Sequence, residues 1–264
     1  MTRQRLGQHF LAAAAWRERI ARAVLAPSPE AKGVWIEIGA GHGEMTTLLS
    51  RHASRVVAVE LDETLLPGLR ELARRLGNVT VAAGDVLSLD LGALAEGRDY
   101  SVYGNIPYYI TSPIVHHLFS GAKLPDAAFL VMQLEVGERL AARPGRRDYG
   151  YLSAFTQFYA RAEIVLRIPP GAFRPPPKVD SALVALRPPG ERARLAVRDE
   201  PAFINFLKLC FSQKRKTLRN NLRSVTPDGR AGALLEQSGI RPDARAEQLG
   251  LQELAHLFAQ VQEG

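Results

Sequence analysis

The feature that most constrains the fold is a regular alternation of short apolar strands and helical patterns over the first half of the chain. Such an alternation is typical of a parallel sheet with helices on both faces. The expected strands are residues 34–38, 55–60, 79–83, 100–104, 127–133, 162–168 and 181–186. The last two flank a proline-rich turn and could add an antiparallel edge.

The strand signal stops after Pro188, and only helical patterns follow. These patterns cover residues 201–211, 215–222, 229–238 and 251–262. We therefore expect a protein of the α/β class with two domains. Residues 1–188 form a domain with a mostly parallel sheet, and residues 189–264 form a small all-α domain.

Charge narrows the class of partner. The net charge is +7 and the sequence pI is about 9.8, which favours a polyanionic partner. Six cations and no acid stand between Lys208 and Arg223, and two more basic clusters surround Arg143 and Arg19. The single cysteine, Cys210, excludes an internal disulfide, and the histidine spacing predicts no metal site.

The apolar runs and the N-terminal stretch of the sequence bear on where the protein is located. There is no run of about 18 apolar residues, so we expect no membrane span. The basic stretch Met1–Gln8 has neither an apolar core nor a small-residue cleavage site. We expect a cytoplasmic protein and, since nothing demands a dimer, a monomer.

A glycine-rich loop, Glu37–Gly43, joins the first expected strand to a helix. Glycines at 39 and 41 allow a sharp turn and the close approach of a ligand. Glu44 stands where a dinucleotide fingerprint would have glycine, and a carboxylate there is a poor neighbour for a pyrophosphate. S-adenosylmethionine has no phosphate and fits the loop better.

Acidic residues end the next two strands. Glu60 can accept hydrogen bonds from both ribose hydroxyls, and Asp85 can accept one from the exocyclic amine of adenine. Either acid alone could instead be a helix N-cap or a solvated charge. Because consecutive strand ends supply them beside the glycine loop, we interpret them together as cofactor-binding groups.

The turn Gly104–Tyr108 suits methylation of an amino group on a planar base. The Asn105 side-chain oxygen and the Ile106 carbonyl, held extended by Pro107, can both accept hydrogen bonds from the amine. Such bonds favour a pyramidal nitrogen whose lone pair points at the methyl donor. Tyr108 can stack on the base, which contributes about 1–3 kcal/mol. The turn could also be an ordinary strand-to-helix connection.

At this point the chain resembles the small-subunit rRNA adenine N6-dimethyltransferases, with the macrolide-resistance rRNA methyltransferases as close relatives. The resemblance covers essentially the whole length and implies a Rossmann-like methyltransferase domain with an N-terminal segment over the cofactor. The segments that carry it are Leu6–Leu11, Glu37–Gly43, Val59–Glu60, Gly84–Asp85, Gly104–Tyr108, Met132–Gln133, Tyr149–Ser153, Phe173–Ser181 and Phe211–Leu222.

The resemblance also implies residue roles. Asn105, Ile106, Pro107 and Tyr108 would hold the target amine and ring, and Phe173 would close the other face of the base. Most relatives have Asn at the position of His9, whose backbone could still serve. The implied cofactor-binding residues are Gln8, His9, Leu11, Gly39, Gly41, Glu60, Leu61, Asp85, Val86 and Asn105.

The implied substrate is a pair of adjacent adenines in a hairpin loop near the 3′ end of 16S rRNA, inside immature 30S particles. Each adenine would receive two methyl groups during ribosome assembly, and its base must be unstacked to expose N6. The basic residues would grip the RNA backbone. These residues are Arg143, Arg146, Arg147, Lys178, Lys214, Arg215, Lys216, Arg219 and Arg223.

Two other functions stay open on the residues alone. A DNA amino-methyltransferase would share the same amine chemistry, although the helical C-terminal domain and the Phe173–Ser181 motif disfavour it. A non-enzymatic binding module could share the same fold. The intact Asn105–Tyr108 turn weighs against that module, because a pure binder has no use for amine acceptors.

Overall fold

The computed structural model describes residues 9–25, 32–213, 216–223, 226 and 229–262. They divide into two compact units. The N-terminal unit takes residues up to Gly137 together with Glu163–Pro188, and the C-terminal unit takes Glu138–Ala162 together with the chain from Pro189 onward. Along these residues, no helix is long and apolar enough to cross a membrane.

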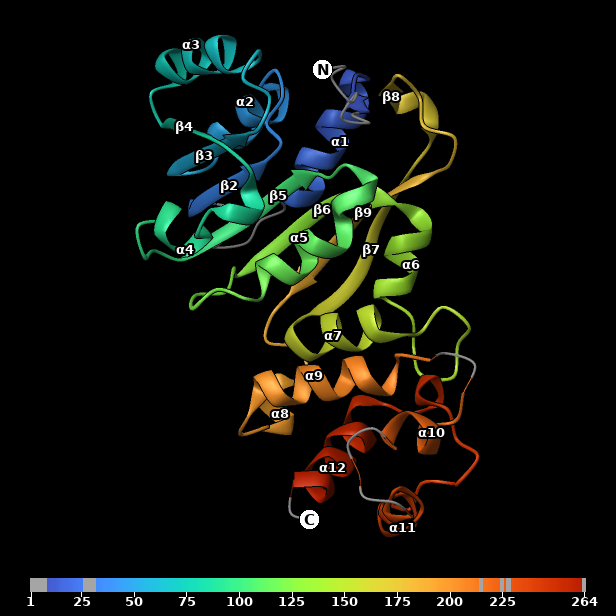
Figure 1. Ribbon diagram of the computed structural model, residues 1–264. Helices are drawn as coiled ribbons and strands as arrows, with labels where there is room; N and C mark the ends of the chain where they lie inside the picture. The colour runs from blue at the N-terminus through green and yellow to red at the C-terminus, as the bar shows by residue number, and fades with distance from the viewer. Residues whose placement is uncertain (1–8, 26–31, 214–215, 224–225, 227–228, 263–264) are drawn as a thin grey trace, which may run out of the picture. The chain divides into compact units, whose positions relative to one another are not determined.

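A seven-stranded sheet organises the N-terminal unit (Figure 1). Its order is β4-β3-β2-β5-β6-β9-β7, with β4 through β6 parallel and β9 antiparallel to β6. The strands are β2 (Val34–Ile38), β3 (Arg55–Glu60), β4 (Val79–Ala83), β5 (Tyr100–Asn105), β6 (Ala127–Gln133), β7 (Arg161–Ile168) and β9 (Ser181–Arg187). The expected parallel sheet with an antiparallel addition is confirmed.

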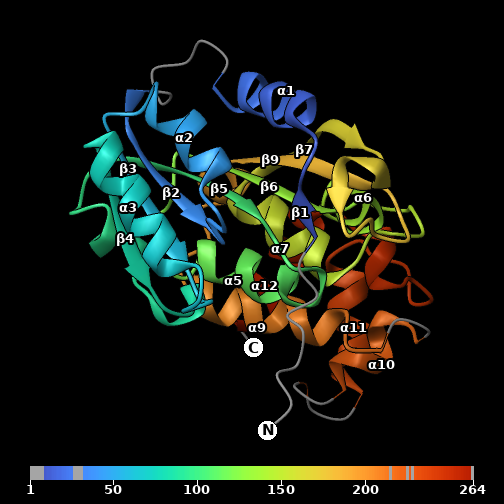
Figure 2. The same ribbon diagram turned by 90° about the horizontal axis from the view of Figure 1, so that it is seen from above.

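Helices cover both faces of this sheet. Figure 2 shows α1 and α2 on one side and α5 on the other. One face packs against α1, α2 and α3 through a core that includes Trp35, Tyr103 and Phe129. The helices here are α1 (Ala14–Val24), α2 (Glu44–Ser50), α3 (Leu66–Leu76), α4 (Leu91–Leu94), α5 (Thr111–Leu118) and α6 (Leu134–Leu140), with 3₁₀ turns η2 (Val86–Ser88), η3 (Tyr108–Ile110) and η4 (Pro170–Ala172).

A second, two-stranded sheet joins distant parts of the chain. β1 (Phe10–Leu11) pairs antiparallel with β8 (Phe173–Arg174), so that Leu11 lies opposite Phe173. The backbone nitrogens of Ala12 and Ala13 extend the contact by donating to the carbonyl of Ala172. The N-terminal segment is thereby fixed to the segment that precedes β9.

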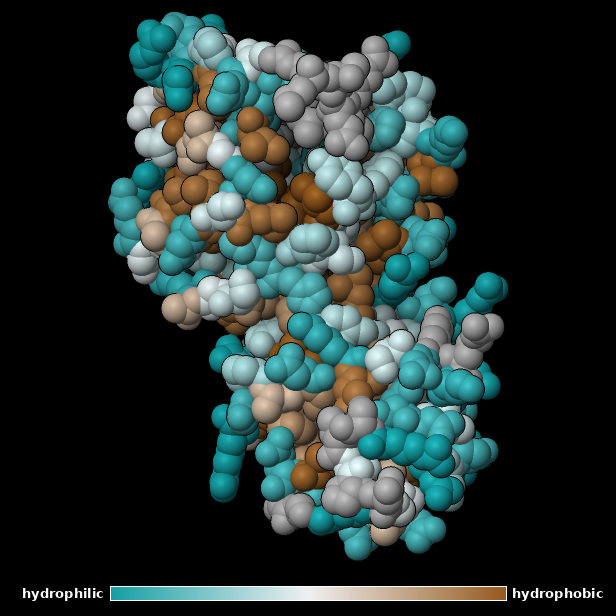
Figure 3. Space-filling model, viewed as in Figure 1, coloured by the Kyte–Doolittle hydropathy of each residue, from teal (hydrophilic) through white to brown (hydrophobic). Residues whose placement is uncertain are grey.

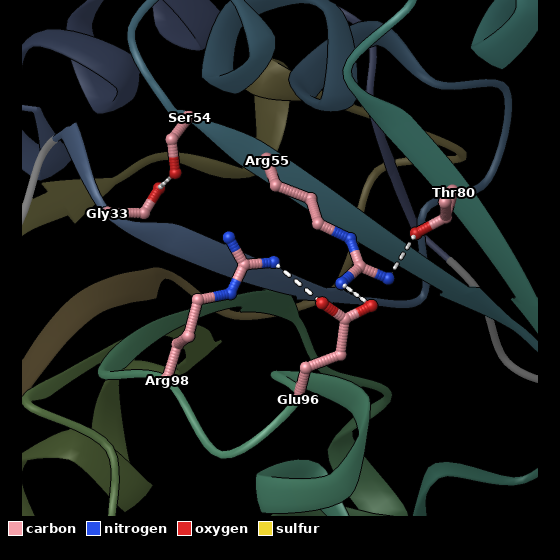
Figure 4. Close-up of polar contacts among 6 residues, drawn as sticks. All are labelled: Gly33, Ser54, Arg55, Thr80, Glu96 and Arg98. Atoms are coloured by element: carbon pink, nitrogen blue, oxygen red, sulfur yellow. Dashed lines mark hydrogen bonds and ion pairs between the residues drawn. The ribbon is translucent and has the colours of Figure 1, made fainter.

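Ion pairs fasten the sheet at the end where β3 begins (Figure 4). Glu96 bridges Arg55, at the start of β3, and Arg98, whose Nη2 lies 3.0 Å from its carboxylate. Arg55 also donates to Thr80 Oγ1 on β4 at 3.4 Å. Exposed pairs of this kind contribute at most about 1 kcal/mol each. Arg55 and Arg98 therefore stabilise the end of the sheet that lies opposite the carboxyl ends of its parallel strands.

Helices make up the C-terminal unit, and aromatic side chains pack its interior. The Phe158 ring of α7 lies 5.2 Å from that of Phe203 on α9, which lies 5.4 Å from that of Phe258 on α12. The elements are α7 (Tyr151–Tyr159), α8 (Arg192–Leu195), α9 (Glu200–Cys210), α10 (Leu218–Leu222), α11 (Arg230–Gln237), η5 (Ala246–Gln248) and α12 (Leu251–Gln262).

This aromatic packing corrects the expected domain limits. The division after Pro188 coincides with the expected boundary, but residues 138–162 group with the C-terminal helices rather than with the sheet. The reason is the burial of Phe158 against Phe203, since both side chains are fully buried. The C-terminal unit is therefore discontinuous in sequence.

One acid lies inside a core strand. Glu37 is 2% exposed on β2, and Thr46 Oγ1 on α2 donates to its Oε2. Burial raises the pKa of Glu37 to about 8; the Thr46 hydrogen bond opposes this rise, and the nearby Glu44 and Glu60 add to it. Glu37 is thus mostly protonated at neutral pH.

Stability should therefore fall as pH rises from about 4.5 to about 8, because in that window the unfolded chain loses the Glu37 proton and the folded chain keeps it. Each unit of pKa difference corresponds to about 1.4 kcal/mol. We expect Glu37→Gln to be more stable relative to wild type at pH 8 than at pH 5 by a few kcal/mol. Urea unfolding of both proteins between pH 5 and pH 8 gives the two free energies of unfolding. If these free energies changed with pH in parallel, the prediction would be contradicted.

The turn after Pro188 requires glycine. Gly190 has φ +60°, and a Cβ there would lie 2.5 Å from the backbone nitrogen of Ala160 and 2.6 Å from the carbonyl oxygen of Gln157. Gly239 has a similar φ of +68°, but its added Cβ would meet open space. The two positions therefore separate backbone strain from steric overlap.

We expect Gly239→Ala to cost about 1–2 kcal/mol, the strain of a left-handed conformation. Gly190→Ala should cost about 1–3 kcal/mol more, because overpacking adds to the same strain. Chemical unfolding of the two variants beside wild type gives the comparison. If both variants lost the same free energy of unfolding, the backbone near Ala160 would have moved to accommodate the added methyl group at no energetic cost.

Candidate active site

A cleft lies at the carboxyl ends of β2 and β5, where the strand order of the sheet reverses. β2 pairs with β3 on one side and with β5 on the other, and Ile38 lies opposite Gly104. A Cβ placed on Gly39 would lie 3.8 Å from the backbone oxygen of Asn105. The glycine loop and the Asn105 turn therefore border one crevice, the usual ligand position in open α/β sheets.

The cleft takes in about 450 Å³ together with its open mouth. Its lining residues are His9, Phe10, Gly39, Gly41, Glu60, Asn105, Ile106, Pro107 and Tyr108. The structure thus brings together half of the expected cofactor-binding residues and the expected amine-binding turn.

The glycine loop has the backbone shape that its sequence predicts. Gly39, Gly41 and Gly43 have φ values of +71°, +61° and +85°, in the left-handed region that favours glycine. The nitrogens of Gly39 and Ala40 both donate to the carbonyl of Val59, at 2.9 and 3.1 Å. The loop is therefore fixed to the end of β3 while its glycines leave room for a ligand.

Glu60 holds this loop in a way that the sequence did not predict. Its Oε2 accepts from Gly41 N at 2.7 Å, and its Oε1 accepts from Leu61 N and Asp62 N at 2.9 and 2.8 Å. A carboxylate offers about four acceptor sites, so these three main-chain N–H groups occupy all but one. Glu60 can accept one further ribose hydroxyl, whereas the expected pair of ribose bonds would displace a backbone partner.

The other expected cofactor residues lie outside the lining of the cleft. Asp85 is exposed and caps η2, since its Oδ1 accepts from Leu87 N at 3.0 Å. This is the N-cap alternative raised by the sequence, and it leaves the second carboxylate oxygen for an exocyclic amine. Leu61 is 50% exposed, while Val86 and Leu11 are buried. Gln8 lies outside the described residues.

The amine-binding turn is held from both sides. Ile106 is buried and donates its N–H to the carbonyl of Val131 at 2.9 Å, and Pro107 follows it. The Tyr108 hydroxyl and Ser181 Oγ lie 2.8 Å apart. Burial raises the pKa of Tyr108, and the bond to Ser181 opposes that rise. Tyr108 is therefore a neutral, oriented ring at the cleft.

The Asn105 side chain is oriented by the N-terminal segment. Its Nδ2 donates to the carbonyl oxygen of His9 at 2.8 Å. Because a carbonyl oxygen can only accept, the amide nitrogen must face His9, and Oδ1 is the atom left to accept from an amine. The orientation of the expected acceptor, Oδ1, is thus fixed by the backbone carbonyl of His9 in the N-terminal segment.

The N-terminal segment crosses the cleft through two ring contacts. The Phe10 ring lies 5.5 Å from that of His42 in the glycine loop, and the His9 ring lies 5.5 Å from that of Tyr108. A Cβ on Gly41 would lie 3.4 Å from the Phe10 ring. Phe10 was not predicted as a site residue, although its place between His9 and Leu11 in the Leu6–Leu11 motif was a signal for it.

Phe173 is buried in the structure. The resemblance implies that its ring closes one face of the target base; here Phe173 is 2% exposed and belongs to the core cluster that contains Leu11 and Ala172. Its pairing with Leu11 in the β1–β8 sheet explains this burial. The ring that faces Tyr108 in the cleft belongs to His9.

The expected RNA-binding cations are exposed wherever they are described. Arg143, Arg146 and Arg147 lie in the loop between α6 and α7, which is anchored by a bond from Gly145 N to the Glu247 carbonyl. Figure 3 shows mainly hydrophilic residues on the visible face of the C-terminal unit. The other exposed cations are Lys178, Lys216, Arg219 and Arg223; Lys214 and Arg215 lie outside the described residues.

A metal centre finds no support in the described ranges, where no group of three histidine, cysteine, aspartate or glutamate side chains could hold an ion. The cleft offers a different donor set. Backbone turns at glycine, one remaining carboxylate acceptor at Glu60 and the Asn105 amide suit an uncharged sugar and a polar amino acid moiety. Their chemistry fits S-adenosylmethionine.

Comparisons with known proteins agree with this geometry. The ribosomal RNA adenine dimethylase family model matches residues 1–263. The ribosomal RNA small subunit methyltransferase A of Acidobacterium capsulatum is 44% identical over 98% of this chain and 91% of its own length. That of Koribacter versatilis is 38% identical over 98% and 94%.

Solved structures give the same result. A dimethyladenosine transferase from Plasmodium falciparum superposes with a TM-score of 0.81 at 25% identity, covering 97% of this chain and 98% of that one. The 23S rRNA methyltransferase ErmE has a TM-score of 0.71 at 26% identity, covering 96% and 99%. The chain belongs to the ribosomal RNA adenine dimethylase family and is an enzyme with a Rossmann-like methyltransferase fold.

Proposed function

We propose that the protein transfers methyl groups from S-adenosylmethionine to N6 of two adjacent adenines in a hairpin loop near the 3′ end of 16S rRNA. Immature 30S particles in the cytoplasm would be its substrate, and it would act as a monomer. The observation that carries the proposal is the position of the Asn105–Tyr108 turn in one cleft with Gly39, Gly41 and Glu60. The full-length similarity to small-subunit rRNA methyltransferases supports the choice of RNA.

Different groups of the chain would bind the cofactor and the target base. Glu60 and the glycine loop would hold the adenosine part of S-adenosylmethionine, which supplies the methyl group when bound. Asn105 Oδ1 and the Ile106 carbonyl would accept the two N–H bonds of the target amine, which keeps its lone pair out of ring conjugation. Tyr108 would hold the base by stacking. Orientation of this kind accelerates the transfer without a strong general base.

The exposed cations of the C-terminal unit would bind the phosphate backbone of the RNA. Arg143, Arg146 and Arg147 come from one anchored loop, and Lys216, Arg219 and Arg223 from the chain around α10. Each phosphate contact releases a bound counterion, so binding should weaken steeply with salt. A hairpin loop presents an unstacked base at little cost, which suits the cleft.

Labelled S-adenosylmethionine incubated with purified rRNA, DNA and immature small subunits tests the function. We expect label in the rRNA of the subunits and a loss of roughly 100-fold or more with Asn105→Ala, since the variant removes an acceptor that acts on the reacting amine. Asn105→Asp keeps an acceptor and loses the bond to His9, so it should retain more activity than the alanine variant. Label in DNA, or subunit binding without label, would reject the assignment.

Glu60→Ala should weaken the binding of S-adenosylmethionine by about tenfold or more, because a charge-assisted hydrogen bond is worth about 1.5–3 kcal/mol. The glycine loop would also lose the acceptor of the Gly41 N–H, and the segment after β3 would lose the acceptor of the Leu61 and Asp62 N–H groups. Asp90→Ala is the matched control, since that carboxylate caps α4 away from the cleft lining. Titration calorimetry gives both affinities, and an unchanged value for Glu60→Ala would remove Glu60 from the site.

A further inference from the structure

Arg17, in the first turn of α1, binds the main chain of the N-terminal segment. Its Nη1 donates to the carbonyl oxygen of Leu11 and to that of Ala12, each at 2.8 Å. A guanidinium always carries its charge and can only donate, so two carbonyl dipoles are suitable partners for it. These carbonyls lie where β1 leads into α1 (Figure 2). Arg17 therefore joins β1 to α1 by a side chain as well as by the connecting residues.

Helix α1 gives Arg17 a fixed support. Ile20, Ala21 and Val24 of this helix are buried in the core of the N-terminal unit. β1, by contrast, is two residues long and pairs with the two residues of β8. Two short strands paired in this way form at best a marginally stable attachment. The position of β1 therefore depends on its bonds to α1.

The segment that Arg17 holds borders the cleft on two sides. The carbonyl of His9 accepts from Asn105 Nδ2 at 2.8 Å, which leaves Asn105 Oδ1 to accept from the target amine. The ring of Phe10 lies 5.5 Å from that of His42 in the glycine loop. A shift of this segment would turn Oδ1 away from the amine. A misplacement of about 1 Å at a reacting group can cost roughly 100-fold in rate.

We propose that Arg17 is a positioning residue for methyl transfer, which fixes β1 through the carbonyls of Leu11 and Ala12 and so keeps Asn105 Oδ1 directed at the target amine. This inference rests on the proposed function. Arg17 lies outside the lining of the cleft and acts through the main chain of β1. The basic cluster around Arg19 favoured a polyanionic partner, but the Arg17 guanidinium binds the protein's own carbonyls instead.

Two substitutions of Arg17 and one of a neighbour test this role. Arg17→Leu removes the guanidinium, whereas Arg17→Lys keeps the charge and has an ammonium that can still donate to a carbonyl. Arg22→Leu is the matched control, because it removes the same charge from the same helix and Arg22 bonds to the Glu18 carbonyl of α1 itself. The measurements are kcat and KM for methylation of undermethylated small subunits at saturating S-adenosylmethionine.

We expect Arg17→Leu to lower kcat by about tenfold or more while the KM for subunits stays within about threefold. Arg17→Lys should recover part of the lost rate, and Arg22→Leu should stay within about twofold of wild type. An unchanged kcat for Arg17→Leu would overturn the inference. A raised KM with unchanged kcat would overturn it too, by showing that Arg17 binds the RNA.

A double variant separates positioning from a general loosening of the structure. If Arg17 acts through Asn105, Arg17→Leu should change the residual rate of the Asn105→Ala variant by less than about twofold, because the acceptor that it positions is already gone. A loss as large as in the wild-type background would contradict the inference. It would show that Arg17 supports the protein independently of Asn105.

Failure of the proposed function has a different signature, because in that case wild type itself places no label in rRNA. When wild type labels rRNA and Arg17→Leu matches its rate, only the positioning role fails.

Discussion

The reversal of strand order between β2 and β5 is the constraint on which the site depends. β2 pairs with its sequence neighbour β3 on one side and with β5, which a later crossover brings beside it, on the other. The loops after β2 and β5 must therefore leave the sheet side by side. Because Ile38 and Gly104 are in register, these loops begin at the same height, and Gly39 meets the backbone of Asn105.

Side chains in the cleft bind the protein's own backbone before they bind any ligand. Glu60 accepts three main-chain N–H groups, and Asn105 donates to the carbonyl of His9. Each keeps an acceptor after these bonds are made, one site on Glu60 and Oδ1 on Asn105. The protein thus fixes the direction of both acceptors in advance, which lowers the cost of ordering them when a ligand arrives.

The sequence predicted what local patterns determine. The strands are short, mostly apolar runs and the loop glycines adopt positive φ, so the sheet and the glycine loop could be predicted from the sequence. Contacts between segments that are distant in the sequence could not be predicted in this way. The two-residue strands β1 and β8 are too short to show a period, and their pairing buries Phe173 and brings His9 to Tyr108. The four-residue helices α4 and α8 were missed for the same reason.

The amine acceptors also bear on how a double methylation would end. An unmodified N6 amine has two N–H groups, so Asn105 Oδ1 and the Ile106 carbonyl can both be satisfied. After one transfer a single N–H remains, and after two there is none, while the acceptors lose their partners in a partly buried site. An unpaired buried acceptor costs about 1–3 kcal/mol. On the proposed chemistry, the cleft therefore holds the monomethylated base well enough for a second transfer. It binds the dimethylated base least, which favours release of the finished product.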